Sequence, residues 1–273
     1  MTTAVDQRRR SIHDRLMFRA NHLTQAGSRI ALLGMLRHVL ALHHDPTIEP
    51  AIEAAVRQIE PSCTVRPAPG VPAVFVFGDS HAHAMFRSHP GIHTIYYYAC
   101  TMHAVGRDGL DFLRFEHFGV EDGDDVVLLF GEIDARIHIA RQRDVRGRAI
   151  ETVIVALVEA YLAVIDANAA LYRKLGVTVA AVLPPSNDPR LVNDPELAPE
   201  GSIEDRVDFT RRINDTLRPA VAQRGYRYLD LYELYAAPDG ALPPAITLDG
   251  LHIDEAASAL TIRALSALIR RPL

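Results

Sequence analysis

Hydrophobic positions in the first 60 residues recur at steps of three and four, the spacing of amphipathic helices. Pro50 suits the first turn of a further helix over 51–59. Four prolines and a glycine between 61 and 72 indicate a linker. The pattern therefore predicts an N-terminal helical segment with a Pro-rich linker over 1–70 and a second unit over 71–273.

After the linker, short apolar runs alternate with longer helical stretches. The runs lack polar alternation, as expected of parallel strands that are covered on both faces. Strands are predicted over 73–77, 92–99, 125–130, 177–183 and 226–231. Helices are predicted over 148–175, with Gly176 as the residue that ends it, over 202–224 and over 254–270. This alternation predicts a doubly wound α/β sandwich.

Composition narrows the class of protein. The 273 residues are 48% hydrophobic and 23% charged, an ordinary globular balance, and the net charge of -5 disfavours nucleic acid as a partner. The longest apolar run, over 30–42, contains Arg37 and His38 and is too short to span a bilayer. No signal-peptide pattern precedes it. We therefore expect a cytoplasmic protein without a membrane span.

The ionisable residues are unevenly distributed among types. Of the 29 basic residues only Lys174 is a lysine, and there are 13 histidines. No Gly-Lys-Ser/Thr sequence exists, which excludes a P-loop NTPase, and no CxxC pair exists for zinc or redox chemistry. No cofactor is implied. The histidines leave acid–base or metal chemistry open.

Three polar clusters follow predicted strands or precede the last helix. They span 78–81 (Gly-Asp-Ser-His), 131–136 (Gly-Glu-Ile-Asp-Ala-Arg) and 249–252 (Asp-Gly-Leu-His). Ligands of open α/β sheets bind beyond the carboxyl ends of the strands. An Asp three residues before a His can orient that imidazole within one loop, and a serine far upstream can meet the His in space.

Over roughly 72–270 four blocks, in this order, resemble the SGNH (GDSL-type) hydrolase family. They are Gly78-Asp79-Ser80, a Gly after the second strand, the Gly-x-x-Asp of 131–134 after the third strand, and the Asp-x-x-His of 249–252. The resemblance implies a flavodoxin-like three-layer sandwich with a five-stranded parallel sheet, here preceded by a small N-terminal helical segment. It implies ester hydrolysis or acyl transfer through an acyl-enzyme, on a small-molecule ester or an acylated carbohydrate. Ser80 would be the nucleophile, His252 the general base and Asp249 its orienting carboxylate. The backbone N–H groups of Ser80 and Gly106 would bind the oxyanion.

The third block departs from the family pattern. Ile133 stands where the family usually has an Asn that donates a hydrogen bond to the oxyanion. Losing one such donor costs ~3 kcal/mol of transition-state stabilisation. Either Arg136 supplies a compensating cation or Asp134 holds the loop by hydrogen bonds. The alternative function is a binding or scaffolding protein that keeps the fold and has weakened catalysis.

The remaining basic residues near the strand ends carry weaker hypotheses. Arg136 with Arg141 or Arg143 would hold an anionic group of the substrate, the alternative being a solvated loop. His103 and His138 would line the site or lie at the surface.

The other histidines are not expected to bind metal. His81 and His83 lie two apart at a helix start, where side chains do not share a face, so no metal site is predicted. The histidines of the N-terminal helices are expected to be solvated: His13, His22, His38, His43 and His44. The apolar stripe of those helices must bury against the catalytic domain or against a second subunit, which would make a homo-oligomer.

Overall fold

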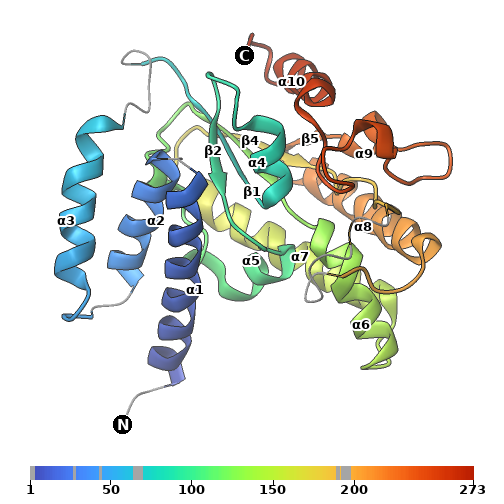
Figure 1. Ribbon diagram of the computed structural model, residues 1–273, viewed down its shortest axis with the longest axis horizontal. Coiled ribbons are helices and arrows are strands. Elements are labelled where there is room, and N and C mark those ends of the chain that lie inside the picture. The colour runs from blue at the N-terminus through green and yellow to red at the C-terminus, as the bar shows by residue number, and fades with distance from the viewer. Residues whose placement is uncertain (1–3, 27–28, 43–44, 64–69, 189–190, 192–197) are drawn as a thin grey trace.

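A five-stranded, all-parallel sheet forms the centre of the molecule, with strand order β2-β1-β3-β4-β5 (Figure 1). The computed structural model describes residues 4–26, 29–42, 45–63, 70–188, 191 and 198–273. The strands are β1 Val74–Gly78, β2 His93–Tyr96, β3 Asp125–Leu129, β4 Gly176–Ala180 and β5 Arg227–Leu229. Each overlaps a predicted run. This order is that of flavodoxin-like folds, so the predicted fold class is confirmed.

The two central strands divide the core into two layers. Every residue of β1 and β3 is buried. Phe75 and Phe77 pack in one apolar cluster, whereas Val74 and Val76 pack in the other, because successive side chains of a strand point to opposite faces. The continuous apolar runs of the sequence therefore reflect burial on both sides.

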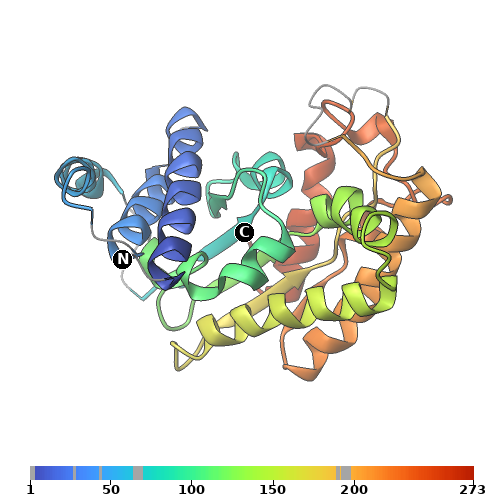
Figure 2. The ribbon, with the colours of Figure 1, turned by 90° about the horizontal axis from the view of Figure 1, so that it is seen from below.

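Helices cover both faces of this sheet. Helices α5, α7 and α8 contribute to the cluster of Phe75, and α4, α9 and α10 contribute to the cluster of Val74. Figure 2 shows α7 along one face and α4 with α10 on the other. The helices are α4 Ser80–Phe86, α5 Met102–Asp108, α6 Ile139–Asp144, α7 Ile150–Ala169, α8 Ile203–Gln223, α9 Leu231–Tyr235 and α10 Glu255–Ile269. Short 3-10 turns are η1 Glu60–Ser62, η2 Gly109–Asp111, η3 Phe115–Phe118 and η6 Pro244–Ile246.

The N-terminal helices are α1 Ala4–Ala26, α2 Arg29–Leu42 and α3 Glu49–Ile59. Their buried side chains, Leu16 and Met35 among them, belong to the same cluster as Phe77. Gly34 lies so close to the ring of Phe118 that a side chain there would overlap it. The apolar stripe thus packs on this chain's own α/β unit, the first of the two alternatives. Positions 64–69 of the predicted linker lie outside the described residues.

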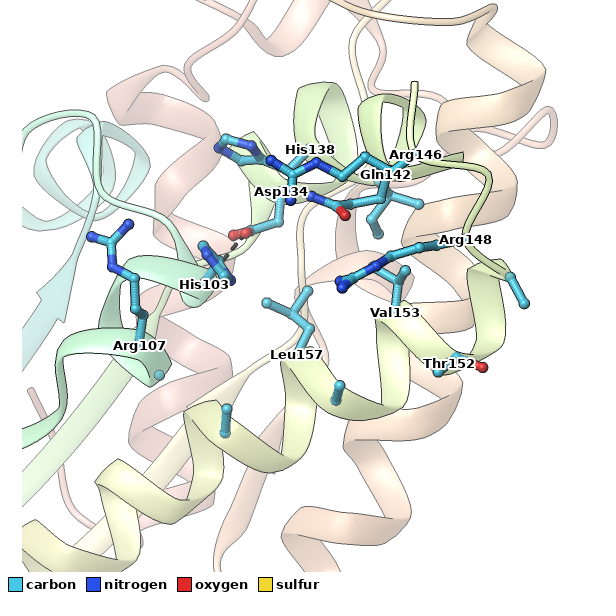
Figure 3. Close-up of a pocket in the computed structure, with 15 residues that line it drawn as sticks. His103, Arg107, Asp134, His138, Gln142, Arg146, Arg148, Thr152, Val153 and Leu157 are labelled. Atoms are coloured by element: carbon cyan, nitrogen blue, oxygen red, sulfur yellow. Dashed lines mark hydrogen bonds between the residues drawn. The ribbon is translucent and has the colours of Figure 1, made fainter. Parts of the chain in front are cut away.

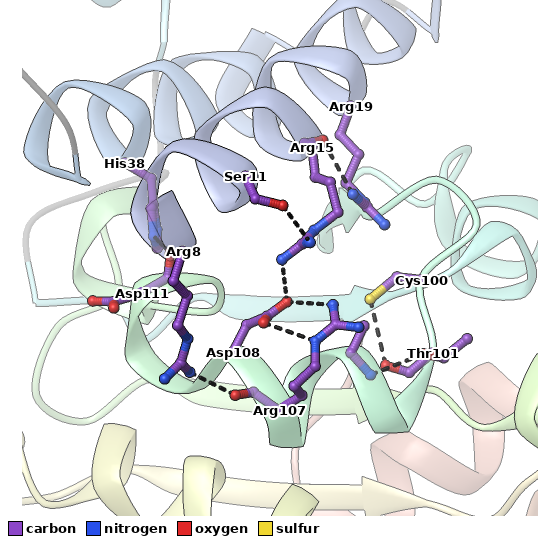
Figure 4. A network of polar contacts seen from close by, with 11 residues as sticks. Arg8, Ser11, Arg15, Arg19, His38, Cys100, Thr101, Arg107, Asp108 and Asp111 are labelled. Atoms are coloured by element: carbon purple, nitrogen blue, oxygen red, sulfur yellow. Dashed lines mark hydrogen bonds and ion pairs between the residues drawn. The ribbon is translucent and has the colours of Figure 1, made fainter. Parts of the chain in front are cut away.

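Polar contacts fasten α1 to α5 (Figure 4). Arg15 Nη2 lies 2.5 Å from Asp108 Oδ2, and Asp108 also accepts from Arg107 at 2.7 and 2.9 Å. Arg8 donates to the carbonyl oxygen of Arg107 at 2.6 Å. The N-terminal segment is therefore joined to the helix that follows β2 by charged as well as apolar contacts.

Two histidines of this segment correct the expectation that they are solvated. His13 and His38 are buried. His38 donates from Nε2 to the carbonyl oxygen of Asp111 at 2.8 Å, and burial, with the nearby His117, lowers its pKa to about 4. The side chains of His22, His43 and His44 lie outside the described residues.

Element boundaries differ from the prediction at α7. This helix ends at Ala169, several residues before Gly176, which instead opens β4 beside the carboxylate of Asp125. A π-helical turn over Asp134–His138 (η4) was not predicted. None of the helices in the described ranges has the length and apolarity that crossing a membrane requires.

Candidate active site

Ser80 is placed by the abrupt turn from β1 into α4. Gly78 allows this turn, because a Cβ there would lie 2.5 Å from the side chain of Ala82 and from the carbonyl oxygen of Leu129. Asp79 caps the helix by accepting the His81 N–H at 2.9 Å. Ser80 is then the first helical residue and is half-buried. Among the described residues no acceptor takes its backbone N–H.

The loop before α10 presents His252. Thr247 and Ile253 form an antiparallel bridge, which closes the loop. Within it, Asp249 Oδ1 accepts the His252 N–H at 2.8 Å and Oδ2 lies 2.6 Å from His252 Nδ1. The Ser186 hydroxyl, from the segment after β4, donates to the Gly250 carbonyl and ties the loop to the sheet. Asp249 therefore holds both the backbone and the imidazole of His252.

Ser80, Asp249 and His252 line one pocket of about 320 Å³. His252 contacts Asp249 through Nδ1, so the Nε2 atom of His252 takes no part in that contact. Nε2 is shielded from solvent and has no hydrogen-bond partner in the part of the chain that the structure describes. His83 stacks on Tyr96 in the same pocket, with ring centroids 4.9 Å apart. The fold thus brings together a hydroxyl and an oriented imidazole from opposite ends of the α/β unit.

A buried polar group lies behind His252. The ring of His81 is 5.0 Å from that of His252, and His81 Nε2 is 3.7 Å from Glu132 Oε2. Glu132 in turn pairs with Arg136 at 3.0 Å. All of these except His252 are at least nine-tenths buried. No three His, Cys, Asp or Glu side chains in the described ranges converge as metal ligands would.

Burial and neighbouring charges separate the pKa values of these groups. Burial, followed by the charge of His81, lowers the pKa of His252, and Asp249 opposes this shift. Burial alone would lower the pKa of His81, but Glu132 and Asp79 reverse the direction and raise it. Burial opposes the ionisation of Glu132, yet Arg136 and His81 lower its pKa to about 2. The pKa values of the two neighbouring imidazoles are therefore shifted in opposite directions, that of His252 downward and that of His81 upward.

Two other buried carboxylates, Asp79 and Asp134, have raised pKa values, whereas the pKa of Glu132 is lowered. Burial raises the pKa of Asp79 to about 6. Burial also raises the pKa of Asp134 to about 7, although Asp134 accepts the backbone N–H groups of Met102 at 2.7 Å and His103 at 3.2 Å. Asp134 thus holds the start of α5, the loop-holding role weighed against a compensating cation from Arg136. Asp134 is buried and lines a hollow other than the pocket of Ser80, so the structure separates it from the predicted nucleophile.

Arg136 does not compensate for the missing Asn. Its side chain is buried and bonded to Glu132, and its carbonyl oxygen accepts the N–H of Glu200 at 2.9 Å. The guanidinium is therefore enclosed by protein and unavailable to a substrate. Arg141 and Arg143 are also paired, with Glu200 at 2.8 Å and with Asp205 at 2.6 Å.

Gly106 is a further correction. It lies inside α5 and faces α7, where a Cβ would come 2.9 Å from the side chain of Ala160. Backbone N–H groups within a helix donate to the carbonyl four residues earlier, so this N–H is not free for an oxyanion. Gly106 allows two helices to approach closely instead.

Gly106, Asp134, His103 and His138 all line a second hollow, of about 810 Å³, between α5, η4–α6 and α7 (Figure 3). None of its lining residues belongs to the pocket of Ser80. The residues predicted as one site are therefore divided between two hollows.

Solved structures share this architecture. A GDSL-like lipase from Bacteroides thetaiotaomicron aligns with a TM-score of 0.51 and 16% identity, over 80% of this chain and 94% of that one. The fold is that of a GDSL-like lipase. A lipase/acylhydrolase from Enterococcus faecalis aligns at 0.45 and 16% identity, over 73% and 93% of the two chains. A lipolytic protein of the G-D-S-L family from Veillonella parvula aligns at 0.42 and 14%, over 74% and 100%. By sequence, no family model and no curated protein matches.

Sequence reasoning missed two features of the site in this GDSL-like fold. The first is Glu132, whose only signal was its place directly after a strand and beside Gly131. The second is Ala99, which follows β2 with a positive φ of 47°, a conformation that a residue with a Cβ rarely adopts. Ala99 follows β2, which pairs in parallel with β1, the strand that leads into Ser80.

Proposed function

We propose that the chain is a serine-dependent ester hydrolase or acyltransferase that works through an acyl-enzyme. The observation that carries the proposal is the shared pocket of Ser80 and His252, with Asp249 bonded to Nδ1 and Nε2 left without a partner. This is the arrangement in which an imidazole activates a hydroxyl nucleophile.

In the first half-reaction Ser80 Oγ bonds to the carbonyl carbon of the ester while its proton moves to His252 Nε2. The negative charge that develops on the carbonyl oxygen lies near the unpaired N–H of Ser80. The intermediate then collapses, the bond to the alcohol oxygen breaks, and His252 returns its proton to the leaving alcohol. Asp249 stabilises the imidazolium throughout.

In the second half-reaction water, or an acceptor hydroxyl, attacks the acyl-enzyme. Its proton passes to His252 and then to Ser80 Oγ as the acyl group leaves. Hydrolysis and transfer differ only in this acceptor, so both belong to the proposal. The substrate class is a small-molecule ester or an acylated carbohydrate.

Hydrolysis of aryl acetates by the purified chain tests the proposal. The Ser80→Ala variant should lose at least about a thousandfold in kcat/KM, since nothing else in the pocket supplies the nucleophile. Ser88→Ala, at an exposed serine two residues past α4, is the matched control and should retain full activity. Wild-type and Ser80→Ala proteins that hydrolyse aryl esters equally would contradict the proposal.

A second candidate is a binding protein that keeps the fold with weakened catalysis. It is favoured by Ile133, which cannot donate a hydrogen bond, and by the burial of Gly106 against α7. Under this alternative the folded wild type, like Ser80→Ala, hydrolyses no aryl ester. It also forms no acyl-enzyme with an activated ester.

A further inference from the structure

The 810 Å³ hollow is lined by two chemically distinct walls. One wall is apolar and comes from a single face of α7, with Val153, Ala156, Leu157 and Ala160 in succession. These residues recur at steps of three and four, so they form one stripe along the helix. The volume is within the range of small-molecule sites in proteins. An aliphatic chain lying along α7 would be covered on one side by this stripe.

The opposite wall is cationic. Arg146 and Arg148 reach over the hollow from the connection between α6 and α7, with Val153 and Leu157 beneath them in the view of Figure 3. Neither arginine pairs with an acidic side chain in the described part of the chain. Arg141 and Arg143, from the same stretch, are both held by acids outside the hollow. Arg107, the third arginine that lines the hollow, is paired with Asp108, so Arg146 and Arg148 are the two left available to an anion.

Two imidazoles complete the polar end. The rings of His103 and His138 lie 6.5 Å apart and both line the hollow. Burial lowers the pKa of both, and the next causes are Arg107 for His103 and His103 for His138. Asp134, the acid in this wall, is occupied by two backbone N–H groups and its raised pKa reduces its charge near neutrality. The wall thus offers guanidinium and imidazole donors with little opposing charge.

We infer that this hollow binds an amphipathic anion, an aliphatic chain that ends in a carboxylate or a phosphate. The chain lies on the α7 stripe and the oxyanion lies between Arg146 and Arg148, whose planar guanidinium groups suit either head group. The site is separate from the pocket of Ser80, with which it shares no residue. It is a ligand site beyond the proposed ester chemistry and does not depend on it.

Calorimetric titration of the Ser80→Ala protein tests this inference without turnover. Octanoate and octyl phosphate are the two amphipathic anions, and octanol is the neutral molecule with the same chain. We expect at least one anion to bind at least tenfold more tightly than octanol. The tighter of the two anions identifies the head group.

Two variants and one control locate the site. Arg146→Gln/Arg148→Gln should weaken binding of the anion at least tenfold. Arg29→Gln/Arg263→Gln removes the same charge from exposed arginines outside the hollow and should change the affinity less than twofold. Ala156→Phe, at an exposed position of the stripe, should fill the chain-binding surface and weaken binding with both arginines intact.

Three results would overturn the inference: neither anion binds, octanol binds as well as the anions, or the two arginine pairs affect binding equally. If the wild-type protein hydrolyses no ester, the proposed function fails, but the anion-binding measurements on Ser80→Ala are unaffected. Circular dichroism of each variant confirms that the fold is retained.

Discussion

Two imidazole–carboxylate pairs lie next to each other at the carboxyl edge of the sheet, and their surroundings differ. The Asp249 side chain is 50% exposed and that of His252 21%, whereas those of His81 and Glu132 are 2% and 6% exposed. The outer pair shares a pocket with Ser80, and the inner pair is closed off by Arg136. The same two chemical groups thus lie at a pocket in one place and inside the protein in the other.

The difference has a physical origin. Asp249 acts on His252 from the solvent side, where water screens its charge, so burial and the neighbouring His81 prevail and the pKa of His252 falls. Glu132 acts on His81 inside the protein, where screening is weak, and the pKa of His81 rises. The two imidazoles therefore differ in the direction of their pKa shifts because their carboxylate partners differ in exposure.

The largest effect is expected from the outer imidazole. His252→Ala should reduce kcat/KM for aryl esters by about a thousandfold or more, because it removes the imidazole that Asp249 orients within the pocket of Ser80. His89→Ala, outside that pocket, should leave the rate unchanged. Equal rates for His252→Ala and wild type would refute the proposal that His252 is the general base.

The inner carboxylate should matter more for stability. Glu132→Gln leaves Arg136 and His81 buried without a counter-charge, which is expected to cost about 3 kcal/mol in the free energy of unfolding at pH 7. Glu53→Gln removes the carboxylate of a pair with the same spacing at the surface, Glu53–Arg57, and should cost less than about 1 kcal/mol. Chemical denaturation of both variants measures the contrast.

The pH dependence of that contrast follows from the pKa of Glu132. Its value of about 2 in the folded chain lies below the ordinary 4.5, so its contribution is complete above pH 4.5 and is lost as the pH falls toward 2. The difference between wild type and Glu132→Gln should therefore shrink by about 2 kcal/mol between pH 7 and pH 3. A difference that stays constant over this range would show that Glu132 is uncharged in the folded protein.

Asp249→Asn should lower kcat/KM by about a hundredfold, because the amide neither stabilises the imidazolium nor enforces the right tautomer. It also removes the charge that raises the pKa of His252, so the acid limb of the pH–rate profile should move to lower pH. Asp14→Asn, at an exposed aspartate that contacts the buried His13, is the control. An unaltered profile in Asp249→Asn would separate Asp249 from catalysis.

The smallest effect is expected from His81→Gln, a change of a few-fold or less in rate at pH 8. Its distinctive result is the pH profile: loss of the His81 cation should raise the pKa of His252 and move the acid limb to higher pH, opposite to Asp249→Asn. His89→Gln provides the matched control. Acid limbs that shift in the same direction in both variants would exclude an electrostatic action of His81 on His252.

The sheet could be predicted from the sequence because its strands are short apolar runs that alternate with longer helical stretches. The sequence also predicts that Ser80, Asp249 and His252 meet, and the structure places them in one pocket. Their catalytic roles stay a prediction. The end of α7 could not, because the apolar pattern continues past Ala169 while the chain must turn toward the sheet at Gly176.

The rest of the site depends on which way each side chain faces, and the spacing of residues along the sequence does not determine this. Gly106 and Arg136 have residue types suited to an active site, yet one faces Ala160 and the other Glu132. Likewise Glu132, 51 positions away in the sequence, raises the pKa of His81. The two side chains lie close together because β1 pairs with β3. Only the packed structure shows which polar groups are satisfied internally.

Covalent labelling of Ser80 tests the central claim most directly. A fluorophosphonate loses fluoride as the serine oxygen bonds to phosphorus, and the hydroxyl proton passes to His252. Intact-mass spectrometry should show one adduct on the wild type, located at Ser80 by peptide mapping, absent in Ser80→Ala and formed far more slowly in His252→Ala. No adduct on the folded wild type, or an adduct that persists in Ser80→Ala, would contradict the account.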